Sequence, residues 1–227
     1  MEIRAVATKL PEAKGNVKGI ASLTIGKDIV VRSIVIREGV NGNLFVCMPS
    51  LKTGRKGKDG KPEYKEICNP ITKELREKMN EAILESYRIE KPVIFQDGRE
   101  GYLSISANAY DEPFGQKVGD AKLYINDSFV VSGISVFAGK QGGFYTAMPG
   151  YKTTRVDENG KAIYQELCSI NKGFLKELNK SIIDQYQKKK EERLLARITI
   201  RERIDEGKVK SKELKTDEKI PKEKILS

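Results

Sequence analysis

The sequence of 227 residues contains no histidine and no tryptophan, and it has only three cysteines. Without an imidazole, the chain cannot build a hydrolase triad that uses histidine as its general base, nor a zinc site with histidine ligands. Its carboxylates are scattered, and no pair stands out as an acid and a base. We therefore expect no enzymatic activity, no catalytic residue, no bound metal and no cofactor.

Long apolar runs are missing as well. No stretch approaches the roughly 18 apolar residues that span a bilayer, and the opening MEIRAVATKL lacks the apolar region of a signal peptide. Cys47, Cys68 and Cys168 are few, odd in number and far apart, which is typical of buried, reduced thiols. These absences predict a cytoplasmic protein that does not bind membranes.

An internal repeat organises the chain. When the sequence is shifted by 100 positions, 19 of the 52 residues from 17 to 68 are identical without a gap. A period of this length corresponds to a domain and is too long for a solenoid unit. We predict a first copy at 1–88, a linker at 89–100, a diverged second copy at 101–186, and a charged tail at 187–227.

Each copy opens with a strand pattern. In the first copy apolar residues alternate over 21–25, β-branched residues fill 28–36, and 26–28 can form a tight turn between them. A further strand at 44–48 ends at Pro49, which cannot donate to a central ladder. The second copy repeats this pattern, so each copy should form an antiparallel β-meander.

A polar loop at 50–66 and then a helix should follow the meander. Asn69 is expected to cap this helix, with Pro70 as its first residue, and apolar residues recur at every fourth position from Leu75 to Tyr87. The predicted fold class is α+β, with two tandem domains that each end in one helix. In the tail, the second helix is expected to extend towards Asp205, with disorder beyond Gly207.

The basic excess is unevenly distributed. The net charge is +10, from 42 Lys and Arg against 32 Asp and Glu. Residues 1–91 carry +6, residues 92–186 carry −1, and residues 187–227 carry +5. A polyanionic partner such as DNA or RNA is therefore expected to contact the first copy and the tail.

The candidate phosphate contacts lie mainly in the 50–66 loop. They are Lys52, Arg55, Lys56, Lys58, Lys61 and Lys65, with weaker candidates at Lys152, Arg155, Lys188, Lys189 and Lys190. Charge alone leaves two interpretations of the loop open, because a solvated loop that keeps a sheet edge soluble has the same composition. For the tail, a solvated helix with ion pairs between successive turns is the competing interpretation.

Two segments of the first copy resemble the stage V sporulation protein G (SpoVG) family of septation regulators. These are 41–50 (NGNLFVCMPS) and 63–71 (EYKEICNPI), which are similar to the family's GLFVAMPS-like strand and EFRDIAHPI-like segment. The second copy is more diverged, and the tail has no counterpart in the family. The resemblance implies a small α+β domain that binds DNA and RNA and affects septation and sporulation.

The family's basic positions fall on Lys52 and Lys65, whereas the other loop cations are assigned by charge. Asn69 replaces the family histidine, and Gln165 replaces its arginine in the second copy. Because family members pair as homodimers, the two copies are expected to form an intramolecular pseudo-dimer, with a homo-oligomer of the whole chain also open. The leading hypothesis is a nucleic-acid-binding regulator, and the alternative is a protein-interaction scaffold of the division or sporulation machinery.

Overall fold

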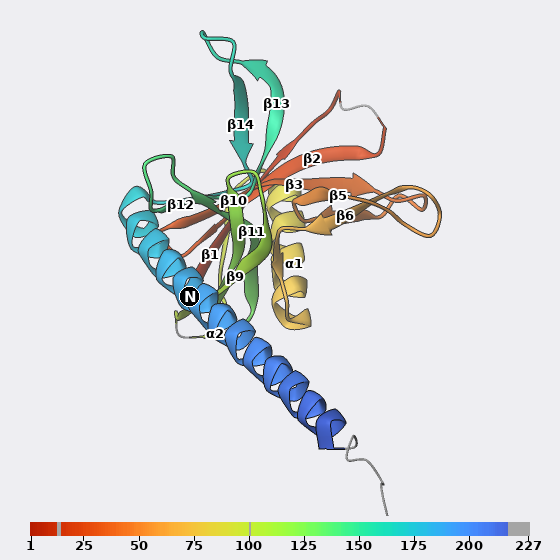
Figure 1. Cartoon of the computed structure of the whole chain (residues 1–227). Coiled ribbons are helices and arrows are strands. Elements are labelled where there is room, and N and C mark those ends of the chain that lie inside the picture. Colours follow the sequence, from red (N-terminus) through yellow and green to blue (C-terminus); the bar gives the residue numbers. More distant parts are fainter. Residues whose placement is uncertain (13–14, 100, 218–227) are drawn as a thin grey trace, which may run out of the picture. The chain divides into compact units, whose positions relative to one another are not determined.

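The computed structural model describes residues 1–12, 15–99 and 101–217. Its first copy has eight strands and one helix (Figure 1). They are β1 (Glu2–Lys9), β2 (Val17–Ile25), β3 (Ile29–Glu38), β4 (Leu44–Cys47), β5 (Ser50–Lys56), β6 (Pro62–Glu66), β7 (Cys68–Pro70), α1 (Lys73–Ile89) and β8 (Val93–Gln96). Strands β1 to β4 pair antiparallel in chain order, and β8 pairs with β1, which confirms the predicted meander.

The second copy repeats the arrangement without an equivalent of β8 among its described residues. Its elements are β9 (Leu103–Phe114), β10 (Lys117–Ile125), β11 (Phe129–Ala138), β12 (Phe144–Ala147), β13 (Gly150–Val156), β14 (Ala162–Glu166), β15 (Cys168–Ile170) and α2 (Lys172–Asp217). Strands β9 to β12 form the second meander. The α+β prediction, with a helix after each meander, is confirmed.

Tight turns connect the second and third strands of each meander. In the second copy Asn126 and Asp127 have φ angles of 52° and 46°, the left-handed conformation that a type I′ turn requires at both central positions. In the first copy Gly26 takes this conformation, with a φ of 61°. Asn and Asp tolerate it better than other side chains do, so the predicted hairpin turns form in both copies.

Two short strands are exchanged between the copies. Strand β7 of the first copy pairs with β11 of the second, where Cys68 lies opposite Val131. Strand β15 of the second copy pairs reciprocally with β3, where Cys168 lies opposite Val31. Each sheet is therefore completed by a strand from the other copy. Residues 1–186 accordingly form one compact unit with a continuous apolar core.

One helix covers one face of each sheet. Helix α1 packs against β1, β4 and β8, and it buries Leu75, Met79 and Ile83 of the predicted stripe. In the second copy Leu178, Ile182 and Tyr186 of α2 are buried in the same way. Tyr87 is only half-buried. The opposite face of each sheet is left uncovered by these helices.

The start of α1 differs from the prediction. Asn69 and Pro70 belong to β7, and the helix begins at Lys73 after Thr72, whose Oγ1 accepts a hydrogen bond from the Leu75 amide at 3.4 Å. The amide of Asn69 instead takes part in the exchanged ladder opposite Val130. Pairing with the second copy thus overrides the local capping pattern, which the isolated segment would favour.

Two further expectations are corrected. The polar segment 50–66 is a β-hairpin formed by β5 and β6, not an irregular loop, because its alternating residues pair across a turn at 57–60. Helix α2 continues through Gly207 to Asp217, where disorder was expected. A single glycine costs a helix only about 1 kcal/mol, and the surrounding Lys and Glu residues are good helix formers. Residues 218–227 lie outside the described part of the chain.

The described part of the predicted linker, residues 89–99, contacts both copies. It contains β8, and beyond that strand Asp97 is buried. The Asp97 carboxylate accepts hydrogen bonds from the Asn126 side-chain amide at 3.2 Å and from the Ser128 hydroxyl at 3.4 Å. The N-terminal ammonium of Met1 donates to the carbonyl of Arg99 at 2.9 Å. Hydrogen bonds to both copies therefore hold this connection in place.

The repeated cysteines meet in the core. Cys68 and Cys168 are both fully buried, as predicted, on the two exchanged strands. A hydrogen bond with the Cys168 thiol, together with burial, raises the pKa of Cys68 well above that of a free cysteine. Cys47 differs from the prediction because it is only half-buried on β4. It lies opposite Val35, on the sheet face that α1 does not cover.

Gly119 provides a test of how closely β9 and α2 pack around β10. A Cβ at this position would lie 2.4 Å from the carbonyl oxygen of Asn108 and 2.9 Å from the ring of Tyr186. We expect Gly119→Ala to lower the free energy of unfolding by about 1–3 kcal/mol, because a backbone oxygen cannot move aside easily. Urea denaturation measures this. Gly101→Ala, with no atom within 4 Å of the added carbon, is the control; equal stabilities would contradict the packing.

The cysteine environments predict selective alkylation. At mildly alkaline pH, iodoacetamide should modify Cys47 in the folded protein and leave Cys68 and Cys168 unmodified. A raised pKa keeps the Cys68 thiol protonated, and burial excludes the reagent from both core thiols. Intact-mass spectrometry should show one adduct in buffer and three in denaturant. A second rapid adduct in the native protein would show that the core thiols are accessible.

Candidate nucleic-acid interface

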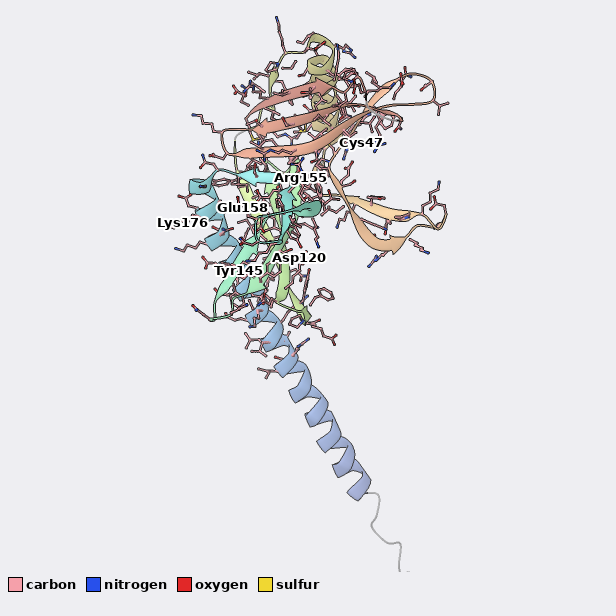
Figure 2. All side chains as sticks on the ribbon, turned by 90° about the horizontal axis from the view of Figure 1, so that it is seen from above. Cys47, Asp120, Tyr145, Arg155, Glu158 and Lys176 are labelled. Atoms are coloured by element: carbon pink, nitrogen blue, oxygen red, sulfur yellow. The ribbon has the colours of Figure 1, made fainter. Side chains whose placement is uncertain are left out.

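The predicted basic loop is a two-stranded ribbon, and within the described residues β5 and β6 pair with no other strand (Figure 2). In its register Lys52 lies opposite Tyr64, and Leu51 lies opposite Lys65. Residues opposite each other share one face of a ribbon, and successive residues alternate between faces. The two family-derived positions, Lys52 and Lys65, therefore lie on opposite faces. Lys52 shares its face with a tyrosine that is 62% exposed.

All six predicted cations of this hairpin are exposed. Within the described residues, only Lys61 forms an ion pair, with Asp59 at 3.7 Å. Lys52, Arg55, Lys56, Lys58 and Lys65 have no carboxylate partner in that part of the chain. An exposed ribbon with five uncompensated cations presents a positive surface that a polyanion can approach from either face.

The base of the hairpin is fixed to the helix. The guanidinium of Arg76 on α1 forms an ion pair with Glu66 at 2.9 Å and also donates to the carbonyl of Pro70 at 3.0 Å. The amide of Ile67 donates to the carbonyl of Pro49, which closes the ribbon. Arg76 therefore neutralises the carboxylate nearest the hairpin base, so that Glu66 does not offset the charge of the cations further along the ribbon.

The hairpin of the second copy has the same frame with different charges. Strands β13 and β14 pair with Lys152 opposite Tyr164, while Tyr151 lies opposite Gln165. At the tip the Asp157 carboxylate accepts hydrogen bonds from backbone amides, including that of Lys161 at 2.8 Å. Arg155 and Glu158, labelled in Figure 2, lie on this hairpin. Its positive charge is thus weaker than that of the β5–β6 hairpin, as the sequence predicts.

Strand exchange brings an unpredicted arginine beside the second hairpin. The amide of Arg32 on β3 donates to the carbonyl of Leu167 at 2.8 Å, and its guanidinium donates to the Ser169 hydroxyl. Arg32 thereby lines a hollow together with Tyr151 and Lys152 of the second copy. The repeat alignment could have drawn attention to Arg32, because the equivalent residue of the second copy is Ser132. No local sequence pattern, however, indicates that β3 lies beside the second hairpin.

The tail cations lie on the part of α2 that follows the compact unit. Lys188, Lys189 and Lys190 are exposed, and Lys189 pairs with Glu192 at 2.6 Å. That hydrogen-bonded contact lowers the pKa of the Glu192 carboxyl. Paired charges of this kind fit the solvated-helix interpretation as well as a phosphate contact, so these residues stay weaker candidates.

Other kinds of site find no support in the described residues. No group of three or more His, Cys, Asp or Glu side chains in that part of the chain is placed to hold a metal ion. Nor does any described helix combine the length and hydrophobicity that a membrane span requires. The hairpin cations and the uncovered sheet faces are the features that remain to be explained.

Comparison with known proteins gives the same family as the motifs. The sequence model of the SpoVG family matches residues 1–89 and 106–188. A protein of Clostridium perfringens named "Putative septation protein SpoVG" is 40% identical over 97 residues, which is 43% of this chain and the whole of that protein. The protein of the same name from Clostridium beijerinckii is 44% identical over 87 residues, covering 38% of this chain and 88% of its own length.

No solved structure gave a significant match to the chain. The family match covers both meander-and-helix copies and most of the sequence, and it stops at residue 188, where the tail follows. The chain therefore belongs to the SpoVG family and carries two tandem copies of the family's domain.

Proposed function

We propose that this protein is a non-enzymatic, nucleic-acid-binding regulator that contacts phosphates through the β5–β6 hairpin. One observation carries the proposal: five of the hairpin's cations are exposed without a carboxylate partner among the described residues. Uncompensated charge also serves solubility, but here it gives one projecting hairpin a positive field that attracts a polyanion. Phosphate contacts of this kind release counterions, so binding should weaken steeply with salt.

The arrangement of the hairpin favours a ligand with both phosphates and bases. Lys52 lies opposite the exposed Tyr64, so a cation and an aromatic ring share one face. An aromatic ring can stack on a base while the neighbouring cation contacts a phosphate of the same strand. Lys188, Lys189 and Lys190 on the tail would add further phosphate contacts. The names of the relatives give septation as the process, and we propose that this binding serves its regulation.

The hairpin assignment predicts the effect of charge removal. We expect the variant K52A/R55A/K56A/K65A to bind DNA and RNA about tenfold more weakly or worse at low salt, and to reduce the salt slope by as much as about 3 units. Fluorescence anisotropy titrations at several salt concentrations measure both quantities. The matched control, K27A/K73A/K78A/R88A, removes the same charge from other surfaces and should keep most of the slope.

Two results would contradict the proposal in different ways. If the hairpin variant retained the affinity and slope of the unmodified protein, the phosphates would be bound elsewhere on the chain. If the unmodified protein bound neither DNA nor RNA at low salt, the scaffold alternative would be favoured. In that case the partner would be a protein of the division or sporulation machinery.

A further inference from the structure

The uncovered face of the first copy's sheet forms a groove with the second copy's hairpin. Two hollows meet there. One, of about 550 Å³, lies over β1, β2 and β3, and the other, of about 850 Å³, follows the β13–β14 hairpin. Arg32, Tyr151 and Gln165 line both hollows, so these form one continuous groove. Since its walls come from different copies, we call it the cross-copy groove.

Arginines lie along the sheet side of this groove. Val6 and Val35 line the first hollow, and Arg4 and Arg37 lie two residues away from them on β1 and β3, which places them on the same face. Together with Arg32 they form no ion pair within the described residues. Three arginines without carboxylate partners thus follow one side of the groove.

The hairpin side adds further cations and aromatic rings. Lys152 and Arg155 line the second hollow, as do Tyr151 and Tyr164, which are 39% and 69% exposed. On the sheet, Phe45 lies opposite Arg37 in the register and is also exposed. Glu166 is the carboxylate in this lining, so cations and exposed rings outnumber acidic groups there, as they do on surfaces that bind single-stranded nucleic acid.

The pseudo-equivalent face of the second copy lacks the three arginines. Ser104 and Ser132 occupy the positions of Arg4 and Arg32. Phe137 occupies the position of Arg37, and its ring stacks on Tyr145 with centroids 5.2 Å apart. Asp120, labelled with Tyr145 in Figure 2, adds a negative charge to that copy. The three arginines are thus found on the uncovered face of the first copy and not on that of the second. The shared fold does not require them, since the second copy forms the same sheet without them.

We propose that a single strand of nucleic acid binds in the cross-copy groove. Its phosphates contact Arg4, Arg32 and Arg37, and its bases stack on Tyr151, which shares its face of the β13–β14 ribbon with Gln165 and faces the sheet of the first copy. The inference rests on the proposed function for the class of ligand, but it assigns a site separate from the β5–β6 hairpin. Hollows of about 300–1,000 Å³ enclose small ligands; a duplex keeps its bases stacked inside and cannot insert them there.

The second copy of the repeat supplies conservative test variants. Arg4→Ser and Arg32→Ser introduce the residues that the second copy already has at these positions, and Tyr151→Leu introduces the counterpart Leu51. We expect the double variant R4S/R32S to bind a short fluorescein-labelled oligothymidylate roughly tenfold more weakly, with a salt slope about 1.4 units smaller. Tyr151→Leu should weaken binding by roughly tenfold with the slope unchanged. The matched control is K122S/K140V, which also removes two charges.

Cys47 provides a local readout. It lies opposite Val35 at the edge of the groove, and its alkylation by iodoacetamide can be followed by mass spectrometry. Saturating oligothymidylate should slow this reaction severalfold in the unmodified protein and in the hairpin variant K52A/R55A/K56A/K65A. In R4S/R32S, at an oligonucleotide concentration that saturates only the unmodified protein, the rate should stay close to that of the free protein. A duplex of the same length should leave the rate unchanged.

The outcomes separate the groove from the hairpin. If the protein binds oligothymidylate but R4S/R32S binds equally well and Cys47 is not protected, the groove assignment is wrong and the hairpin proposal stands. Equal protection by the duplex would overturn the single-strand assignment. If the unmodified protein binds no nucleic acid at low salt, the proposed function itself fails. Loss of binding in K122S/K140V equal to that in R4S/R32S would show that only overall charge matters.

Discussion

The reciprocal exchange of β7 and β15 is the interaction on which the rest of the structure depends. Each of these strands is only three residues long, yet each completes the sheet of the other copy and carries a fully buried cysteine. An isolated copy would expose the backbone of β3 or β11 along an unpaired edge. The exchange also determines the surroundings of both hairpins, because β6 leads into β7 and β14 leads into β15. Architecture and candidate interface are therefore consequences of one pairing.

Strand exchange also changes how the charge distribution is understood. Counted by sequence, residues 92–186, which include the second copy, carry a net charge of −1. In the folded chain its hairpin lies beside Arg32 of the first copy, so its few cations join an arginine face instead of standing alone. The first copy's strongly basic hairpin lies beside the sheet of the second copy. There Leu51 lines another hollow with Ser135 and Phe137. In the cross-copy groove the positive charge comes mainly from the first copy's sheet. Beside the second copy's sheet it comes mainly from the first copy's hairpin.

The meanders, their turns and the helical stripe could be predicted from the sequence because they depend on local periodicity and on residues such as Asn126 that favour particular turns. The helix start at Thr72 could not, because the Asn69–Pro70 segment has a capping pattern that loses to pairing with β11. The hairpin cations were identifiable by charge. Arg32 and Arg4 were not, since their importance depends on which hairpin lies over which sheet, and that is a long-range property of the exchange.

Covalent linkage of exchanged copies has a consequence for synthesis. The last strand of the first copy's sheet is β15, at Cys168–Ile170, so that sheet remains incomplete until most of the chain has left the ribosome. Domains usually fold as units from the N-terminus while translation continues at about 5–20 residues per second. Here β3 would have an unpaired edge for the several seconds between synthesis of the first copy and synthesis of β15. Folding of the first copy during synthesis is therefore coupled to the second copy. A nascent chain that stalls near residue 150 would carry a first sheet that lacks β15.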